Sequence, residues 1–336
     1  MIRLADIAKR AGVSLGAVSA ALNGAVRGNI RLSQARREHI LAIAKEMNYV
    51  PNLSAQCLSG RSSHTLGVLI DSQDAAVRFR QLAAIEREAD KRGYRIIVAE
   101  SHEDSDKLWY NCRTLLQYGV DAVLSPINFA NEELRREKKV VFYGAEAVPG
   151  CRTVYYDIAD GYAVAFAQFR REKRNMPSLI FSGNLEDSDS IRARYAAFMH
   201  EFPGGEENIC ICPEIPASTE ELPAFFRKIV DDFVIPRRID AIVAQNDLCA
   251  LALLHALRQC GIRVPQDCSL VGHDNSDFCP LVEPALTSID PNLEEFGKAV
   301  VDLTVEYIEH PDLPVRTVAV PTRLCLRGTT MGGKDS

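Results

Sequence analysis

The stretch GVSLGAVSAALNG, Gly12–Gly24, places a short helical pattern between two glycines. Gly12 interrupts the pattern that precedes it, Ser14 stands where a side chain can cap a new helix, and Asn23 with Gly24 is a stop signal. Nearly all side chains between these limits are small. Such a helix either packs tightly against a neighbouring helix or lies deep in a groove, so its flanks must decide between the two.

The flanks predict two more helices. Ser33 is expected to cap the third helix, and the first two helices are joined by a tight glycine turn, which is typical of a helix-turn-helix unit. In the small-residue helix, Val18 and Leu22 are expected to bury against the first helix. The apolar stripes are Leu4, Ile7, Ala8 and Ala11 before Gly12, and Ile40, Ile43, Ala44 and Met47 after Ser33. The side chains expected to face outward, small enough to enter a major groove, are those of Leu15, Gly16, Ala17, Ser19 and Ala20.

Charge is divided unevenly along the chain. Residues 1–63 hold nine Lys or Arg and three Asp or Glu, a balance of +6, whereas the other residues hold 30 basic and 42 acidic side chains, a balance of −12. A basic head on an acidic body is expected when one end of a chain meets a phosphate backbone. We therefore favour DNA contact over helix packing as the use of the small-residue helix.

Two segments, LADIAKRAGVSLGAVSAALNG (4–24) and YVPNLSAQCLSG (49–60), resemble the head and hinge of the lactose-repressor family of bacterial transcription regulators. In that family the second helix reads the major groove. This chain departs from the family at Leu15, Gly16 and Ala20, where relatives usually carry a bulky polar pair or an arginine. Taken with the helix pattern, the resemblance implies DNA contacts by Ser14, Leu15, Gly16, Ala17, Ser19, Ala20 and Asn23, with Arg31 in the following loop.

The segment 51–61 is a polar linker too short to form a stable helix alone. In relatives this segment becomes a hinge helix on DNA, and a leucine from each chain enters the minor groove. The resemblance assigns that role to Leu58, with Ala55 beside it and Asn52 at the start of the segment. We expect a linker that folds on binding DNA.

Beyond residue 64, short apolar runs alternate with helical stretches such as Phe79–Arg92 and Leu108–Tyr118. Strands of four to six residues separated by long helices predict parallel sheets with helices on both faces. The runs are TLGVLI (65–70), RIIVA (95–99), DAVLSP (121–126), KVVFYG (139–144), SLIFSG (178–183), NICIC (208–212), DAIVAQ (240–245) and CSLVGHD (268–274). The expected fold is α/β, with two doubly wound parallel-sheet lobes after a small three-helix head.

The family resemblance extends to about residue 328 and implies a periplasmic-binding-protein-like body with a ligand cleft between its lobes. The expected division is a head at 1–50, a hinge at 51–63 and a body at 64–330. Lobe one comprises 64–158 and 290–319, and lobe two comprises 159–289 and 320–330. The chain is expected to cross between lobes near 157–161, 288–291 and 318–322, and a helix at Leu293–Glu309 is expected to return to lobe one.

Ligands of open α/β sheets bind beyond the carboxyl ends of the strands. Arg194 and Asp274 match family positions that grip the effector, with Arg192 as a rival to Arg194, and Asp247 starts a helix beside a cleft position. The relatives' Asn-Pro-aromatic-aromatic run is absent, so an aromatic platform, if there is one, would come from Phe79 or Tyr156. The candidate effector-binding residues are Asp71, Ser72, Ser125, Ser190, Arg194, Asn246 and Asp274.

These patterns predict a dimeric DNA-binding regulator, a repressor whose operator affinity depends on a sugar-like metabolite. The alternative is a solute-binding sensor or transport protein without a DNA role, which would need an export signal where the basic head stands. An enzyme is disfavoured because GxSxG, Walker, GxGxxG and HExxH motifs are absent and His102, His200 and His273 are scattered.

No cofactor is expected, and the cysteine spacing argues against a metal site. We interpret the ten cysteines, including Cys210 and Cys212, as reduced thiols that fill the core. No apolar run approaches the length of a membrane span. A cytoplasmic protein is therefore expected.

Overall fold

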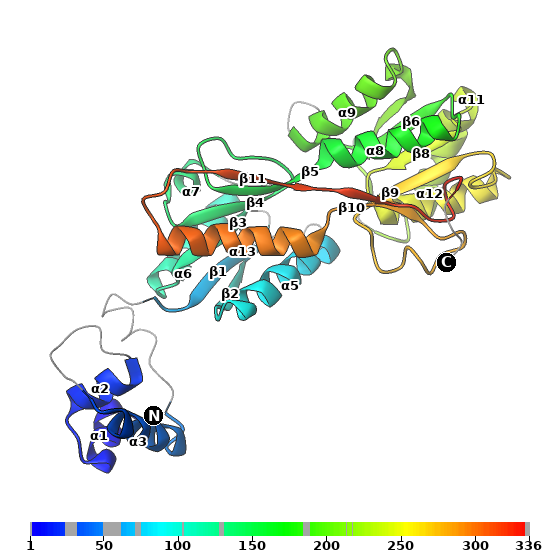
Figure 1. Ribbon diagram of the computed structural model, residues 1–336. Helices are drawn as coiled ribbons and strands as arrows, with labels where there is room; N and C mark the ends of the chain where they lie inside the picture. Colours follow the sequence, from blue (N-terminus) through cyan, green and yellow to red (C-terminus); the bar gives the residue numbers. More distant parts are fainter. Residues whose placement is uncertain are drawn as a thin grey trace. The chain divides into compact units, whose positions relative to one another are not determined.

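The computed structural model describes residues 2–23, 32–49, 62–70, 75–102, 104–127, 131–183, 189–212, 214–216 and 218–332. They form two compact units, Met1–Ser63 and His64–Ser336 (Figure 1). Six residues proposed for binding lie outside the described ranges: Arg31, Asn52, Ala55, Leu58, Asp71 and Ser72.

The head contains three helices, α1 (Leu4–Ala11), α2 (Leu15–Asn23) and α3 (Gln34–Glu46). Gly12 ends α1 with a φ of 64°, a left-handed conformation that glycine adopts without steric cost. The Ser14 hydroxyl accepts a hydrogen bond from the backbone N–H of Ala17 at 3.2 Å. Ser33 accepts one from the N–H of Arg36 at 3.4 Å. The predicted turn and both predicted caps are confirmed.

A small apolar core holds the three helices together. Ile7 of α1, Val18 and Ala21 of α2, and Ile40 of α3 are fully buried and belong to one cluster. Burial of each Ile or Val side chain contributes roughly 1.5–3 kcal/mol. Every helix supplies at least one of these residues, so the core fixes all three helices relative to one another.

The body begins with a six-stranded sheet in the order β11-β5-β4-β3-β1-β2, all of whose neighbours pair in parallel. Its strands are β1 (Thr65–Ile70), β2 (Arg95–Glu100), β3 (Ala122–Pro126), β4 (Val140–Gly144), β5 (Thr153–Asp157) and β11 (Thr317–Pro321). Its helices are α5 (Ala75–Lys91), α6 (Ser105–Gln117), α7 (Glu132–Arg136) and α13 (Leu293–Glu309). We call this part lobe one.

Lobe two is built on a second sheet in the order β12-β10-β9-β8-β6-β7, parallel except for β12 against β10. Its strands are β6 (Pro177–Ser182), β7 (Ile209–Cys212), β8 (Ala241–Ala244), β9 (Ser269–His273), β10 (Thr287–Asp290) and β12 (Arg323–Cys325). Its helices are α8 (Ile158–Arg171), α9 (Asp189–Glu201), α10 (Leu222–Ile229), α11 (Ile235–Arg237) and α12 (Asp247–Gln259). The predicted α/β class with two doubly wound lobes is confirmed.

Both faces of each sheet are covered, which explains why the strands are almost continuously apolar. In β1, Leu66 and Val68 belong to one buried cluster, whereas Leu69 belongs to another on the opposite face. In lobe two, Phe181 and Ile180 are divided between two clusters in the same way. One cluster thus runs through both lobes, and each lobe has a second cluster on the other face of its sheet.

Three chain segments connect the lobes, and they meet at Gly161. The segments are the β5–α8 junction, the connection from β10 to α13, and the β11–β12 junction. A Cβ atom on Gly161 would lie 2.2 Å from Oγ1 of Thr322 and 2.7 Å from Cγ2 of Ile289. Only glycine leaves room for this contact, so Gly161 lets the three connections pack at one point.

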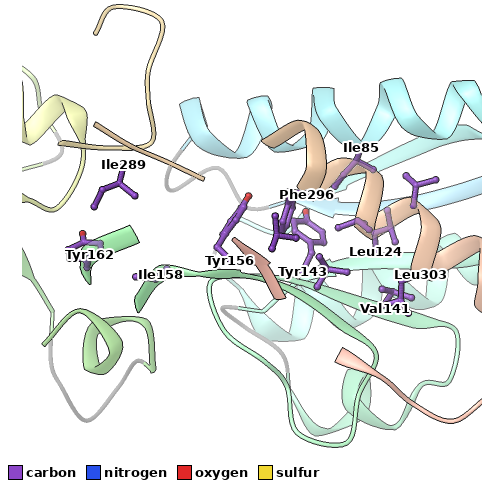
Figure 2. Close-up of a cluster of buried hydrophobic side chains, with 14 of the residues drawn as sticks. Ile85, Leu124, Val141, Tyr143, Tyr156, Ile158, Tyr162, Ile289, Phe296 and Leu303 are labelled. Atoms are coloured by element: carbon purple, nitrogen blue, oxygen red, sulfur yellow. The ribbon is translucent and has the colours of Figure 1, made fainter. Parts of the chain in front are cut away.

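Helix α13 returns to lobe one and packs along α5, as predicted (Figure 1). Phe296 of α13 stacks on Tyr156 of β5 with ring centroids 4.2 Å apart and lies edge-on to Tyr143 of β4 at 6.2 Å. Figure 2 shows Tyr156 at the margin of this lobe-one cluster, on the side of Ile289 and Tyr162. Helix α13 therefore fixes an aromatic side chain where the chain enters lobe two.

Within the described residues, no helix has the length and apolar character needed to cross a membrane. The nine cysteines among these residues are all free thiols. Cys212 is buried and Cys210 is half-buried, and their sulfur atoms lie 3.9 Å apart. Both belong to or pack against the same core cluster of lobe two.

Candidate DNA-binding head and interlobe site

The outward face of α2 is narrower than predicted. Ala17, expected to face outward, is only 7% exposed, whereas Leu15 is 53% exposed. The buried face comprises Ala17, Val18 and Ala21, which are adjacent on a helix with 3.6 residues per turn. This face is centred nearer the start of α2 than the predicted pair Val18 and Leu22, and Leu22 is only partly buried.

The prediction that Ala17 faces outward is therefore wrong. The remaining candidate contacts keep open positions: Ser14 and Leu15 are exposed, and Gly16, Ser19 and Ala20 are half-buried. Asn23 is the last residue of the helix, and its side chain is not among those that the structure describes. The exposed surface at α2 thus consists of Ser14 and Leu15 at its start. The half-buried residues Gly16, Ser19 and Ala20 extend this surface along the helix.

Basic side chains surround this small apolar core. Those described in the head are Arg3, Lys9, Arg10, Arg36, Arg37 and Lys45, and all are exposed. The Nε of Arg37 also donates to the carbonyl of Ala21 at 3.3 Å and so ties α3 to the last turn of α2. Arg10 approaches Glu46 at 3.4 Å, an exposed pair that contributes little to stability. The cations are therefore available to phosphate groups.

In the body, the polar residues of interest gather where β9 ends. We use the term interlobe site for Arg78, Arg80 and Tyr156 of lobe one and for Tyr162, Arg194, His273 and Asp274 of lobe two. Nδ1 of His273 and Oδ1 of Asp274 lie 2.9 Å apart. Asp274 has a φ of 101°, which a residue other than glycine rarely adopts, and its N–H donates to the carbonyl of Ile289 at 2.9 Å. Such outliers persist where the surrounding structure holds them, often at ligand sites.

Arg80 of α5 reaches from lobe one to this loop. Its Nη1 donates to the backbone oxygen of Asp274 at 2.9 Å, and its Nη2 donates to that of Asn275 at 3.0 Å. Hydrogen bonds from a charged guanidinium group to two carbonyl oxygens are stronger than hydrogen bonds between neutral groups. Beside it lies a pocket of about 470 Å³ lined by Arg80, Ala83, Arg87, Asn275, Asp277, Asp290, Leu293, Glu294 and Arg323. The two lobes therefore meet in a direct polar contact at the end of β9.

The ring of Tyr162 in α8 lies close to the side chains of Arg194 and His273. The guanidinium carbon of Arg194 is 5.4 Å from the centre of its ring, and the ring of His273 is centred 5.8 Å away. Burial raises the pKa of the Tyr162 phenol, Arg194 opposes that rise, and Asp274 adds to it. The phenol therefore stays protonated and can donate a hydrogen bond.

Three buried polar atoms of this group have no hydrogen-bond partner among the described residues. They are the hydroxyl of Tyr162, Nε of Arg194 and Nε2 of His273. A buried polar atom without a partner costs roughly 1–3 kcal/mol. Three such atoms around one carboxylate indicate a site whose hydrogen bonds a ligand would complete.

Tyr156 continues the network into lobe one. Its hydroxyl accepts a hydrogen bond from Nε2 of Gln81 at 2.7 Å, and Oε1 of Gln81 accepts one from Nη1 of Arg78 at 3.2 Å. Burial is the main cause that raises the pKa of Tyr156. Arg78 opposes this rise and Asp274 adds to it. The charges of Arg78 in lobe one and Asp274 in lobe two thus act on the same phenol.

Asn246 and Asp247 follow β8, and both accept hydrogen bonds from other residues of lobe two. Asn246 caps α12, since its Oδ1 accepts from the N–H of Cys249 at 2.9 Å. Asp247 is 1% exposed and accepts from the Ser288 hydroxyl at 2.5 Å and from the N–H of Ser276 at 2.6 Å. Burial raises the pKa of the Asp247 carboxyl. Asp247 therefore holds the loop after β9, whereas the amide nitrogen of Asn246 has no bond to another described residue.

Of two further candidates, Ser125 does not lie beyond the end of its strand, whereas Ser190 lies on the helix of Arg194, as predicted. Ser125 was expected to follow the third strand, but it lies inside β3, is fully buried, and donates to the Pro126 carbonyl at 3.2 Å. The strand extends to Pro126 because the register with β4 continues to that residue. Ser190 belongs to α9 one turn before Arg194, and its side chain lies outside the description. Arg192 is exposed, whereas Arg194 is half-buried and faces Tyr162.

Comparison with known proteins finds two family models along this chain. Residues 3–52 match the model of bacterial regulatory proteins of the lacI family, and residues 168–330 match a periplasmic binding protein-like domain. The chain belongs to the lacI family of bacterial regulatory proteins. As a lacI-family protein, it is a DNA-binding transcription regulator.

Relatives of this lacI-family regulator match it over nearly its whole length. It is 26% identical to the ribose operon repressor of Escherichia coli K12, over 98% of this chain and 100% of that protein. It is 25% identical to an HTH-type transcriptional regulator of Lachnoclostridium phytofermentans, over 97% of this chain and 98% of that protein. A crystal structure of the lac repressor dimer bound to operator and the anti-inducer ONPF has the same fold, with a TM-score of 0.83, 22% identity, and 98% and 99% of the two chains covered.

Several residues of the lacI-family regulator's interlobe site could not be predicted by looking for polar residues after the ends of strands. Tyr162 lies inside α8, Arg78 and Arg80 lie inside α5, and His273 is the last residue of β9. Only His273 carried a sequence signal, because it immediately precedes Asp274. The others could be found only once α5 and α8 were placed against β9.

Proposed function

We propose that this lacI-family regulator is a homodimeric repressor whose operator affinity is set by a polar, sugar-like metabolite bound at the interlobe site. The observation that carries the proposal is the set of unpartnered atoms on Tyr162, Arg194 and His273 around Asp274. Hydroxyl groups can both donate and accept, so a polyhydroxylated ligand can complete all of these bonds. The protein acts by binding, without catalysis, in the cytoplasm where its DNA lies.

The DNA half of the proposal rests on the head. We assign residues 1–50 to DNA binding, 51–63 to the hinge, and the remainder to the effector-binding and dimerisation body. Leu15, exposed at the start of α2, and the surrounding exposed cations are the groups available to base edges and phosphates. The proposed hinge contacts are Leu58 with Ala55 and Asn52, and Arg31 is proposed to reach the DNA backbone.

A homodimer follows from the geometry of recognition, because one head contacts only a half-site. The body exposes apolar side chains that a second copy would cover. Phe79 of α5 is 54% exposed, and Ile97 and Val98 of the edge strand β2 are 37% and 40% exposed. An exposed sheet edge with apolar side chains is otherwise an aggregation hazard. We propose that this face of lobe one contributes to the dimer interface.

The effector would act by favouring one arrangement of the lobes. The residues proposed to bind the effector lie in both lobes, on either side of the Arg80–Asp274 contact. Effector binding therefore changes the free energy of this arrangement of the lobes relative to other arrangements. Asp274 and Arg194 are proposed to bind the effector directly, with Ser190 and the Asn246 amide beside them. Asp71 and Ser72 are proposed to complete the site from lobe one.

The test is a fluorescence-anisotropy titration of the purified protein against its own upstream DNA and a scrambled duplex at several salt concentrations. Discrimination between the two duplexes with a steep salt dependence supports operator binding. The same titration with added sugars tests effector control. Equal, weak binding to both duplexes under every condition would contradict the proposal.

A further inference from the structure

The interlobe site contains an excess of unpaired positive charge. Arg78, Arg80 and Arg194 are all half-buried, and none of them forms an ion pair with a described carboxylate. Elsewhere in the body, a comparably enclosed arginine is neutralised: Arg174, with a side chain 10% exposed, lies 3.5 Å from Glu172. Because burial of a charge without a counter-charge is costly, three such guanidinium groups at one site require explanation.

The carboxylates near the site are already engaged. Asp274 faces Nδ1 of His273 at 2.9 Å. Asp247 is enclosed by the hydroxyl of Ser288 and the N–H of Ser276, and burial raises its pKa. Neither carboxylate approaches an arginine within ion-pair distance among the described residues. The missing counter-charge is therefore not supplied by these two groups.

Arg80 can be set aside, because both of its terminal nitrogens donate to backbone carbonyls of the loop after β9. Arg78 and Arg194 retain more donors. Among the described residues, Arg78 donates one hydrogen bond, to Gln81, and Arg194 donates one long hydrogen bond, 3.5 Å, to the carbonyl of Gln245. These two arginines come from opposite lobes.

Arg78 is held in place by its neighbours. Gln81 is 2% exposed and links Arg78 to the hydroxyl of Tyr156, whose ring is stacked on Phe296. The guanidinium is thus anchored through a buried amide to a rigid aromatic pair. An anchored guanidinium presents its remaining donors in a fixed fork, which matches the oxygens of a carboxylate or phosphate.

We propose that the effector is a sugar derivative with one anionic group, a carboxylate or a phosphate, and that Arg78 binds that group while Arg194, Tyr162 and Asp274 bind its hydroxyls. This inference rests on the proposed function and narrows its ligand class. A neutral sugar would leave the Arg78 charge without a counter-ion. An anionic sugar supplies it, and its hydroxyls still satisfy the open donors of lobe two.

The experiment measures thermal unfolding and calorimetric binding of the full chain in a phosphate-free buffer. The probes are matched sets: glucose, gluconate, glucuronate and glucose 6-phosphate, and the corresponding derivatives of galactose and ribose. We expect stabilisation by at least one anionic member and none by its neutral parent. A carboxylate and a phosphate of the same sugar then distinguish the two sources of charge.

Two variants test whether Arg78 is the residue that binds the anionic group of the sugar. Arg78→Gln keeps hydrogen-bonding capacity but removes the cation, and we expect affinity for the anionic sugar to fall by about 30-fold. Lys91→Gln removes an exposed cation from the last turn of the same helix and should leave that affinity unchanged. Equal binding of the anionic sugar to the wild type and to Arg78→Gln would overturn the role of Arg78.

The outcome separates this inference from the proposed function. If a neutral sugar stabilises the protein and changes operator affinity, the effector class is wrong but the repressor proposal stands. If no member of any set binds, the anionic-sugar inference is overturned, and operator titration decides the repressor proposal independently. If an anionic sugar binds without changing operator affinity, the ligand class holds and the proposed effector control fails.

Discussion

The Nη1 atom of Arg80 donates a hydrogen bond to the backbone oxygen of Asp274 across the two lobes, at a distance of 2.9 Å. The contact joins α5 to Asp274, the strained residue that follows β9, and Nη2 donates a second hydrogen bond to the backbone oxygen of Asn275. A helix of lobe one is thereby connected directly to the effector-binding loop of lobe two. Any shift of one lobe against the other must change this pair of bonds.

Arg80→Ala is therefore expected to weaken the observed lobe arrangement. Hydrogen bonds to a charged group contribute about 1.5–3 kcal/mol, so a ligand that prefers this arrangement should bind roughly tenfold or more weakly. Calorimetric titration of the effector measures the change. Lys91→Ala is the control, because Lys91 is exposed in the last turn of the same helix and pairs with Glu88 of that helix. Unchanged effector affinity in Arg80→Ala would show that the contact does not select a lobe arrangement.

Asp247 gives a prediction for pH dependence. Burial raises the pKa of its carboxyl above the ordinary value of 3.8, so the folded state favours the protonated form. Its contribution to stability is fully present below the ordinary pKa and is lost as pH rises through the higher folded pKa. The free energy of unfolding of the wild type, relative to Asp247→Asn, should therefore decrease as pH rises above about 4.

Urea unfolding of both proteins at a series of pH values measures this difference, and the other carboxylates cancel from it. Because Asn lacks the second acceptor for the Ser288 hydroxyl and the Ser276 N–H, the variant should be less stable at low pH by about 2 kcal/mol. A stability difference that grows with pH would contradict the direction of the pKa shift.

The fold was accessible from the sequence because its signals are local. Each long apolar run, such as residues 65–70 and 178–183, became a strand, and Ser14 and Ser33 became helix caps. Strands β5, β10, β11 and β12 were not predicted as strands, although the lobe crossings were placed beside or within them. Length is not the reason, because the predicted strands β7 and β8 have four residues each. In the four missed strands the few apolar residues are flanked or interrupted by Thr, Ser, Asp, Arg or Pro, which are equally common in a connection.

The site was only partly accessible, for a different reason. Asp274 follows a strand, so its position at the sheet edge could be inferred, but the orientation of Ala17 and the burial of Ser125 depend on which neighbour covers them. The approach of Arg80 to Asp274 joins residues 194 positions apart. No spacing in the sequence encodes such a pair, because it depends on how the two lobes pack against each other.

Gly161→Ala tests the point where the three connections meet. A Cβ atom there would overlap Oγ1 of Thr322, which itself donates to the carbonyl of Asp157 at 2.9 Å. Overpacking of this kind typically costs about 1–3 kcal/mol. We expect a lower unfolding temperature and altered effector affinity together, because the strain acts on the lobe connections. A variant as stable as the wild type would mean that these segments move apart freely.

Leu58→Ala tests the proposed hinge. If Leu58 enters the minor groove, its truncation should weaken binding to specific operator DNA by about tenfold and leave effector affinity intact. The measurement is operator anisotropy at fixed salt, paired with effector calorimetry. Because binding to a scrambled duplex depends on the phosphate contacts, it should remain unchanged. Equal operator affinity of variant and wild type would exclude the proposed role.

Leu15→Ala tests how a helix of small side chains reads DNA. Leu15 is the large exposed side chain at the start of α2, and it can make apolar contact with a thymine methyl group. Truncation should reduce specific operator affinity by roughly tenfold, equivalent to about 1.4 kcal/mol, while thermal stability stays nearly constant because the side chain is already in solvent. Leu41→Ala is the matched control, since Leu41 on α3 is also exposed, at 39%. If both variants lose operator affinity equally, the loss reflects a change in the head as a whole, and α2 is not the element that distinguishes one sequence from another.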